Sequence, residues 1–173
     1  MNLSDIKAFA FDVDGVFTDG GILCDLQGEL YRTYDAKDCF AVRMAAMNGY
    51  PVAVITGGRS VSIRHRFRSN GVPDADIYLG SRDKTIDFQD FCDKYSLRRE
   101  DVLYIGDDLP DLPVLALCGC AMCPSDAVDE VKAACHVVSG YPGGKGCVRH
   151  AVESVMKARG DWNFDVAEYK RIF

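Results

Sequence analysis

The sequence predicts a doubly wound α/β fold, in which parallel strands alternate with helices. Short apolar runs, each of the length of a buried strand and too short for a helix, occur at residues 7–12, 51–56, 76–80, 102–106 and 119–123. Helical patterns lie between them near residues 38–48, 59–70, 82–95, 110–117 and 125–134, with a last one near 147–158. Strands that alternate with helices imply right-handed crossovers, which place a parallel sheet between two layers of helices.

One segment departs from this alternation. Residues 18–34 read TDGGILCDLQGELYRTY, with two short extended pieces around the turn residues 25–28. This pattern is typical of a β-hairpin. The segment follows the first predicted strand, at the edge where ligands bind in open α/β sheets. We therefore predict a hairpin flap, residues 17–34, beside a functional site.

The length and the net charge of the chain limit its domain organisation and its possible binding partners. The chain has 173 residues, 48% of them hydrophobic, which suits one domain. We expect that domain over residues 1–158, followed by a C-terminal tail, 159–173. The net charge is −6 and no basic stripe is present, so no nucleic-acid partner is expected. No apolar run reaches the roughly 18 residues of a membrane helix, and the start lacks a signal-peptide pattern. We expect a cytoplasmic protein without a membrane partner.

Eight cysteines are present, and free thiols are their expected state. Without an export signal, a disulfide framework is not expected. Cys118, Cys120 and Cys123 contain one C-x-x-C pattern, which zinc sites and redox pairs also use. A zinc site needs a second pair of ligands, whereas Cys135 and His136 belong to an apolar run. We expect these thiols to behave as small hydrophobic side chains.

Polar residues follow four of the predicted strands. Each group alone is compatible with a helix cap, a tight turn or a solvated lysine. The carboxyl ends of parallel strands meet at one edge of a sheet, however, so the groups converge on one crevice. These residues are Asp12 and Asp14, Thr56 with Gly57 and Gly58, Lys84, and the acidic group Asp107, Asp108 and Asp111.

Carboxylates, a hydroxyl and an ammonium around one crevice indicate Mg²⁺-dependent phosphoryl transfer. Hard oxygen ligands suit Mg²⁺, which commonly bridges carboxylates to a phosphate. Lys84 and Thr56 are suited to bind the phosphoryl oxygens. A carboxylate beside the phosphorus can attack it to form an aspartyl-phosphate. A second carboxyl two residues further on can protonate the leaving alcohol and then activate water.

The same residues carry a resemblance to a known family. FDVDGVFTDG, VITGG, Lys84 and YIGDDLPD resemble, in order and spacing, the four motifs of the haloacid dehalogenase superfamily, and they span residues 7–111. The flap, ITGGRS, YLGSRDK, PSDAV and GGKGCVR are similar to the 3-deoxy-D-manno-octulosonate 8-phosphate (KDO 8-phosphate) phosphatases over residues 5–158. The resemblance implies a phosphoric monoester hydrolase that releases KDO for lipopolysaccharide biosynthesis.

The resemblance also implies roles for individual residues. It makes Asp12 the nucleophile and Asp14 the general acid/base. It implies that Asp12, the backbone carbonyl of Asp14, and Asp107 hold Mg²⁺. Asp108 and Asp111 are expected to orient the site. By the same resemblance, the phosphate is bound by Thr56 and Lys84.

The substrate is the least constrained part of the prediction. A sugar acid carries a carboxylate, and arginine is the usual partner for that group. Arg59 and Arg66 are seven residues apart on the predicted helix after Thr56, so they share a face and both are candidates, although solvated arginines would give the same pattern. Relatives that act on nine-carbon sugar acids (KDN or N-acetylneuraminate 9-phosphate) tend to carry an acidic residue where this chain has Gly58. Gly58 therefore favours the eight-carbon substrate.

No cap domain is expected over the site. The flap, helices and strands fill the intervals between the four motifs, where larger superfamily members insert a cap. The phosphatases that the chain resembles are homotetramers, in which hairpins meet at the centre and neighbouring subunits close each site. We expect the same assembly here, with water exclusion supplied partly by a neighbour.

Two other classes of function stay open at this stage. A phospho-accepting signalling module also uses Asp, Thr, Lys and Mg²⁺ on a doubly wound sheet. Its acidic pair precedes the phospho-acceptor, however, whereas here the Asp-Val-Asp motif comes first and the acidic pair last. An inactive scaffold is the other alternative, but every position that catalysis would need is filled.

Overall fold

A parallel sheet forms the centre of the molecule in the computed structural model. The structure describes residues 2–173, which include all of the predicted domain except Met1. Within this range six strands lie in the order β5-β4-β1-β6-β7-β8, and every paired neighbour is parallel. They are β1 (Ala8–Phe11), β4 (Val52–Thr56), β5 (Ile77–Leu79), β6 (Val102–Ile105), β7 (Cys120–Cys123) and β8 (Val137–Val138). The predicted doubly wound α/β fold is confirmed.

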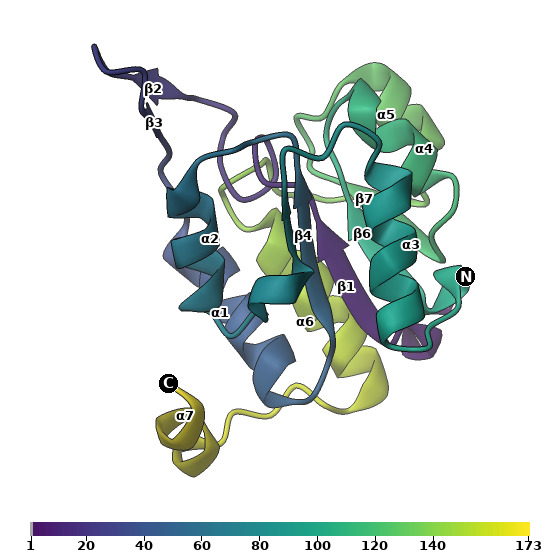
Figure 1. Cartoon of the computed structure of the whole chain (residues 1–173). Coiled ribbons are helices and arrows are strands. Elements are labelled where there is room, and N and C mark those ends of the chain that lie inside the picture. The colour runs from purple at the N-terminus through teal and green to yellow at the C-terminus, as the bar shows by residue number, and fades with distance from the viewer. Residues whose placement is uncertain (1) are drawn as a thin grey trace.

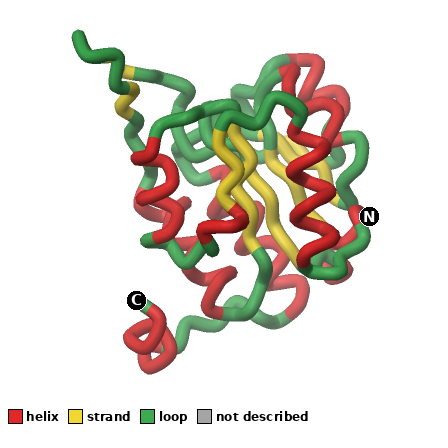
Figure 2. Tube along the Cα trace, in the orientation of Figure 1, coloured by secondary structure: helices red, strands yellow, loops and turns green. Residues whose placement is uncertain are grey.

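Helices cover both faces of the sheet (Figures 1 and 2). On one face lie α1 (Ala36–Met47), α2 (Val61–Arg68) and α6 (Cys147–Arg159), and on the other α3 (Lys84–Lys94), α4 (Leu112–Leu115) and α5 (Asp129–Ala134). Strand β1 is buried on both sides. Phe9 and Phe11 pack in the cluster with α1 and α6, whereas Ala8 and Ala10 pack in the cluster with α3. The large and small side chains alternate because successive strand residues face opposite layers.

The strand order creates the functional crevice. The chain passes from β1 to β4 and β5 on one side, and then returns to β6, β7 and β8 on the other side of β1. The connections after β1 and β6 therefore lead away in opposite directions, which opens a crevice at the carboxyl ends of these strands.

The flap is the hairpin of β2 (Leu23–Cys24) and β3 (Leu30–Tyr31), which are antiparallel. It projects from the main body at the carboxyl-end edge of the sheet (Figure 1). Asp25 closes its turn, because its Oδ1 accepts hydrogen bonds from the amides of Gln27 and Glu29, both at 2.9 Å. In the described chain the segments that follow β1 and β4 contain the flap, α1 and α2 and no inserted cap, as predicted.

Some boundaries differ from the prediction. Helix α2 begins at Val61, two residues after Arg59, because the backbone at the N-cap residue Ser60 is extended. The predicted helix 110–117 is divided into a 3₁₀ turn, Leu109–Asp111, and the short α4. Strand β8 was not expected. It follows His136, whose Nδ1 accepts a 2.9 Å hydrogen bond from the amide of Ala121 on β7, and this contact aligns the edge strand.

The C-terminal tail folds back onto its own chain. It contains α7 (Val166–Ile172), which the sequence did not predict. Nη1 of Arg43 on α1 donates a 2.8 Å hydrogen bond to the hydroxyl of Tyr169, and the rings of Phe40 and Phe164 lie 5.8 Å apart. Throughout residues 2–173, no helix is long and apolar enough to cross a membrane.

The cysteines are free, as expected. Cys118, Cys120 and Cys123 are buried, and burial raises the pKa of Cys118 to about 12 and that of Cys120 to about 11. Among the described residues, the side chains close enough to share a metal ion are aspartates and include no cysteine. These thiols contribute to the apolar packing around β7.

Candidate active site

The site begins where β1 ends. Asp12 follows the last strand residue and is buried, whereas Asp14 is partly exposed on the cavity wall. Gly15 comes next with a φ of +82°, a conformation that glycine adopts without strain. A Cβ atom at Gly15 would lie only 1.9 Å from Oδ2 of Asp107, so glycine is also required for close contact with the loop after β6. The first and last acidic motifs are thereby packed against each other.

Lys84 links the two acidic motifs electrostatically. It is the first residue of α3, and its side chain is buried. Its Nζ lies 3.0 Å from Oδ2 of Asp12 and donates a 2.7 Å hydrogen bond to Oδ1 of Asp111. Burial alone would lower the pKa of Lys84, but the charges of Asp12 and Asp111 outweigh it and raise that pKa. Lys84 therefore carries its positive charge inside the site.

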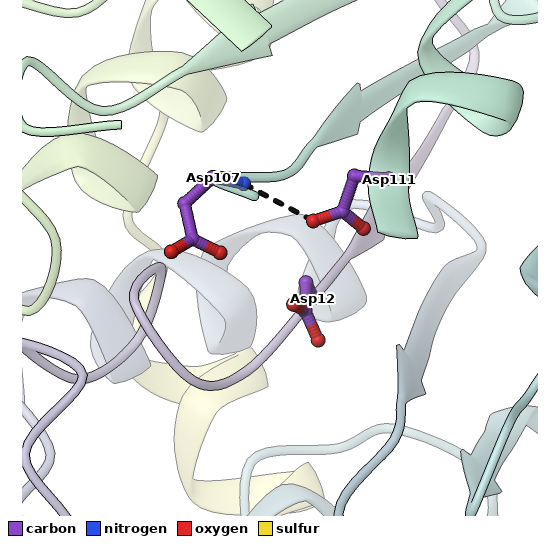
Figure 3. A group of neighbouring side chains, drawn as sticks. All are labelled: Asp12, Asp107 and Asp111. Atoms are coloured by element: carbon purple, nitrogen blue, oxygen red, sulfur yellow. Dashed lines mark hydrogen bonds between the residues drawn. The ribbon is translucent and has the colours of Figure 1, made fainter. Parts of the chain in front are cut away.

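Asp111 holds Lys84 and the loop after β6 in place. It is fully buried and accepts hydrogen bonds from Lys84, from the hydroxyl of Tyr104 at 2.6 Å, and from the amide of Asp107 at 3.1 Å, the last shown in Figure 3. These contacts hold the carboxylate of Asp111 in place. Asp108 lies at the exposed rim, where its carboxylate accepts a 2.8 Å hydrogen bond from the amide of Leu109.

Three carboxylates converge at this point. One oxygen from each of Asp12, Asp107 and Asp111 lies within 4.8 Å of the others (Figure 3). The carboxylate of Asp14 instead pairs with an arginine. The sequence expectation assigned Asp14 a metal contact only through its backbone carbonyl, which leaves its side chain available for that pair.

The electrostatics of this group fit a divalent cation. Burial, followed by the charge of Asp111, raises the pKa of Asp12 to about 7. Burial, followed by the charge of Asp12, raises the pKa of Asp107 to about 8. The positive charge of Lys84 thus compensates the negative charge of the crowded carboxylates only in part. A hard divalent cation such as Mg²⁺ matches both the all-oxygen donor set and the missing positive charge.

A cavity of about 430 Å³ opens above these residues. The loop after β4 forms one wall, and there Oγ1 of the buried Thr56 accepts a 3.0 Å hydrogen bond from the amide of Gly58. The structure thus brings the motif residues predicted from the sequence to one cavity. Its lining comprises Asp12, Asp14, Gly15, Gly20, Thr56, Gly57, Gly58, Ser81, Arg82, Lys84, Asp107, Asp108, Pro110 and Asp111.

The two arginines considered for the substrate carboxylate lie outside this lining. Arg59 precedes α2 and packs over Gly80, where a Cβ atom would lie 3.2 Å from its Nε. Arg66 is on α2, and its guanidinium lies 5.8 Å from the centre of the Tyr34 ring. Its Nε is buried and has no hydrogen-bond partner among residues 2–173. The prediction that both arginines share one helix face is wrong, because Arg59 is not part of the helix.

Sequence reasoning missed Arg32. This flap residue forms a two-point ion pair with Asp14, with Nε 2.6 Å from Oδ1 and Nη2 2.9 Å from Oδ2. The four motifs gave no indication of this residue, because Arg32 lies outside all of them. The available signal was the charge count, since the site holds five acidic motif residues and only one motif lysine.

Gly143 and Gly144 support the site from behind. A Cβ atom at Gly143 would lie 1.9 Å from the backbone oxygen of Gly15. The amide of Gly144 donates a 2.8 Å hydrogen bond to the carbonyl of Val16, and the amide of Gly143 donates one of 2.9 Å to Asp126. The glycine-rich segment before α6 is therefore a packed support for the loop after β1.

Comparison with known proteins agrees with this geometry. Residues 41–149 match the family described as haloacid dehalogenase-like hydrolase. The chain is 31% identical over 156 residues to the 3-deoxy-D-manno-octulosonate 8-phosphate phosphatase of Salmonella typhi, covering 90% of this chain and 82% of that protein.

Two solved structures extend the comparison. The deoxy-D-mannose-octulosonate 8-phosphate phosphatase of Haemophilus influenzae, in a cobalt-bound form, has a TM-score of 0.89 at 33% identity, covering 97% of this chain and 98% of that one. The Moraxella catarrhalis phosphatase, in complex with magnesium, phosphate and KDO, has a TM-score of 0.88 at 28% identity, covering 92% and 91%. With its motif residues gathered around one cavity, the chain belongs to the haloacid dehalogenase-like hydrolase family.

Proposed function

We propose that the protein is a Mg²⁺-dependent phosphatase that hydrolyses KDO 8-phosphate to KDO and phosphate. The observation that carries the proposal is the convergence of Asp12, Lys84, Thr56 and Asp107 on one cavity. Phosphoryl transfer needs a nucleophilic carboxylate, a buried cation, a hydroxyl and a cluster of oxygen ligands for the metal ion. The sugar acid is supported by the names of the relatives and by the KDO bound in the Moraxella catarrhalis structure.

In the first step, a carboxylate oxygen of Asp12 attacks phosphorus. The bond from phosphorus to the ester oxygen breaks, and Asp14 gives its proton to the leaving alcohol. Lys84 and Thr56 stabilise the negative phosphoryl oxygens during this transfer. Asp12, the backbone carbonyl of Asp14 and Asp107 would hold Mg²⁺, which would further neutralise that charge.

In the second step, Asp14 takes a proton from water, whose oxygen attacks the phosphorus of the aspartyl-phosphate. The bond between phosphorus and the Asp12 oxygen breaks, so the free carboxylate and inorganic phosphate are released. The position of Asp14 at the cavity wall, two residues after the nucleophile, allows one group to serve both proton transfers.

A substrate panel tests this proposal. We expect kcat/KM with Mg²⁺ to be highest for KDO 8-phosphate, at least about tenfold above nine-carbon sugar-acid 9-phosphates, because the binding of one wrongly placed polar group costs about 1–3 kcal/mol. An aryl phosphate serves as the generic substrate, and Asp107→Asn as the metal-site control. A preference for a nine-carbon substrate would reassign the sugar acid. A stable phospho-enzyme without turnover would contradict the phosphatase and favour a phospho-accepting module.

We further infer a homotetramer that assembles through the flaps. Leu26 at the flap tip is fully exposed, and Leu23 and Tyr31 are also largely exposed. Apolar side chains gathered on a projecting hairpin are typical of a surface that another subunit covers. We expect sedimentation to give a tetramer, and Leu26→Lys to shift it toward smaller species. Ile86→Lys, at an exposed apolar residue of α3, is the matched control. A monomeric wild-type protein with full activity would contradict the assembly.

A further inference from the structure

Arg32 is buried although it comes from the exposed flap. Its neighbours Leu30 and Tyr31 form strand β3 and face solvent, whereas the side chain of Arg32 is only 2% exposed. Ordering a long, charged side chain costs conformational entropy, so a specific partner must hold it in place. Within the flap, its Nη1 donates a 3.3 Å hydrogen bond to the carbonyl of Leu30, but its charged partner lies outside the flap.

The partner is the carboxylate of Asp14. Both carboxylate oxygens accept from the guanidinium, at 2.6 Å from Nε and 2.9 Å from Nη2. Two parallel hydrogen bonds fix the orientation of a carboxylate as well as its position. The side chain of Asp14 remains 28% exposed and lines the cavity, so it is held without being closed off.

Gly58 provides the space for this contact. A Cβ atom there would lie 3.2 Å from Nη2 of Arg32, 3.3 Å from Oγ1 of Thr56, and 2.8 Å from Cδ1 of Ile63. A side chain at this position would displace the Ile63 side chain and would also crowd the guanidinium. Arg32 therefore lies between the flap, the loop after β4 and the acid that follows β1.

We propose that Arg32 is a positioning residue, which clamps Asp14 at the cavity wall and so couples the flap to proton transfer. This inference rests on the proposed function, in which Asp14 is the general acid/base. With the flap in place, the carboxylate is fixed at the cavity wall. A displacement of the flap would remove Arg32, and Asp14 would then lose the contact that orients it. The flap thus acts on the chemistry within its own subunit, in addition to any contact with a neighbour.

The kinetic test uses Arg32→Met, Arg32→Lys, Asp14→Ala and the double variant Arg32→Met/Asp14→Ala. General acid–base catalysis contributes about 10²- to 10⁴-fold, so we expect Arg32→Met to lower kcat about 10- to 100-fold with little change in KM. Lysine supplies one point of contact, so Arg32→Lys should recover part of the loss. The double variant should be no slower than Asp14→Ala, because Arg32 acts through Asp14.

A matched control separates this effect from the loss of any arginine–aspartate pair. Arg98 makes a similar two-point pair with Asp101. This pair lies next to the first residue of β6, at the amino-terminal ends of the strands and thus away from the cavity. Arg98→Met should leave kcat and KM unchanged. A loss in the double variant that equals the product of the two single losses would overturn the proposal. So would an Arg32→Met variant that changes only KM, since this would make Arg32 a substrate contact.

Hydrogen exchange of the flap amides tests the clamp without relying on turnover. We expect Arg32→Met and Asp14→Ala to increase exchange in residues 17–34 to the same extent, with no further increase in the double variant. Arg98→Met should leave this segment as in the wild type. Wild-type exchange in both single variants would overturn the clamp. If the wild-type protein hydrolyses no phosphate ester, the proposed function fails, but the exchange result still decides whether Asp14 holds the flap.

Discussion

Asp12→Asn is expected to abolish turnover while the protein stays folded. The amide keeps the shape of the carboxylate but lacks the anionic oxygen that would attack phosphorus in the proposed mechanism. Removing the nucleophile of a covalent mechanism removes nearly all of the catalytic advantage, so we expect kcat to fall by at least about 10⁴-fold. Single-turnover measurements should also show no phosphate transferred to the protein.

The stability of the same variant provides the control. Burial and the charge of Asp111 raise the pKa of Asp12 to about 7, so the ionised carboxylate is costly in the folded state without a metal ion. The neutral amide removes this cost. Metal-free Asp12→Asn should therefore be at least as stable as the wild type in urea unfolding. Retained turnover in a folded variant would show that another group is the nucleophile.

Lys84→Met is expected to impair both catalysis and folding. Lys84 contacts the carboxylates of Asp12 and Asp111 and carries the positive charge among them. Loss of one group that stabilises the phosphoryl oxygens should lower kcat by about 10²- to 10³-fold. Breaking a buried ion pair by removing one partner costs about 3–5 kcal/mol. Urea unfolding of the metal-free protein should show this loss.

Mg²⁺ should restore part of the stability of Lys84→Met, because a bound divalent cation replaces some of the missing positive charge. Lys94→Met is the matched control. Lys94 is at the other end of α3, where its Nζ donates a 2.8 Å hydrogen bond to the buried carboxylate of Asp76, far from the cavity. This variant should keep its kcat, and Mg²⁺ should stabilise it as it does the wild type. A stability loss in Lys84→Met that Mg²⁺ leaves unchanged would contradict a shared metal and lysine site.

Much of the fold could be predicted from local patterns. The short apolar runs gave β1, β4, β5, β6 and β7, because a strand buried on both faces has a continuous apolar sequence. Strand β8 was missed because it has only two residues and depends on a contact between His136 and Ala121. Helix α7 was missed because its position depends on long-range contacts such as that of Arg43 with Tyr169.

The residues of the candidate site also fall into two groups, those that local sequence patterns predict and those that they do not. Asp12, Thr56, Lys84 and Asp107 could be found because each lies at the end of a strand or the start of a helix, where topology fixes the position. Arg32 could not be found in this way. It reaches Asp14 only through the bend of a projecting hairpin, which no local pattern encodes.

Gly143 and Gly144 support the loop after β1 although they are far from it in the sequence, and this separation has a consequence for biosynthesis. Residues 12–16 are synthesised well before the backbone that packs behind them at residues 143 and 144. A nascent chain that stops before residue 143 can form the early strands, yet it lacks the contacts that these two glycines make with the loop after β1. We therefore expect the candidate site to be completed only after Gly143 and Gly144 have been translated.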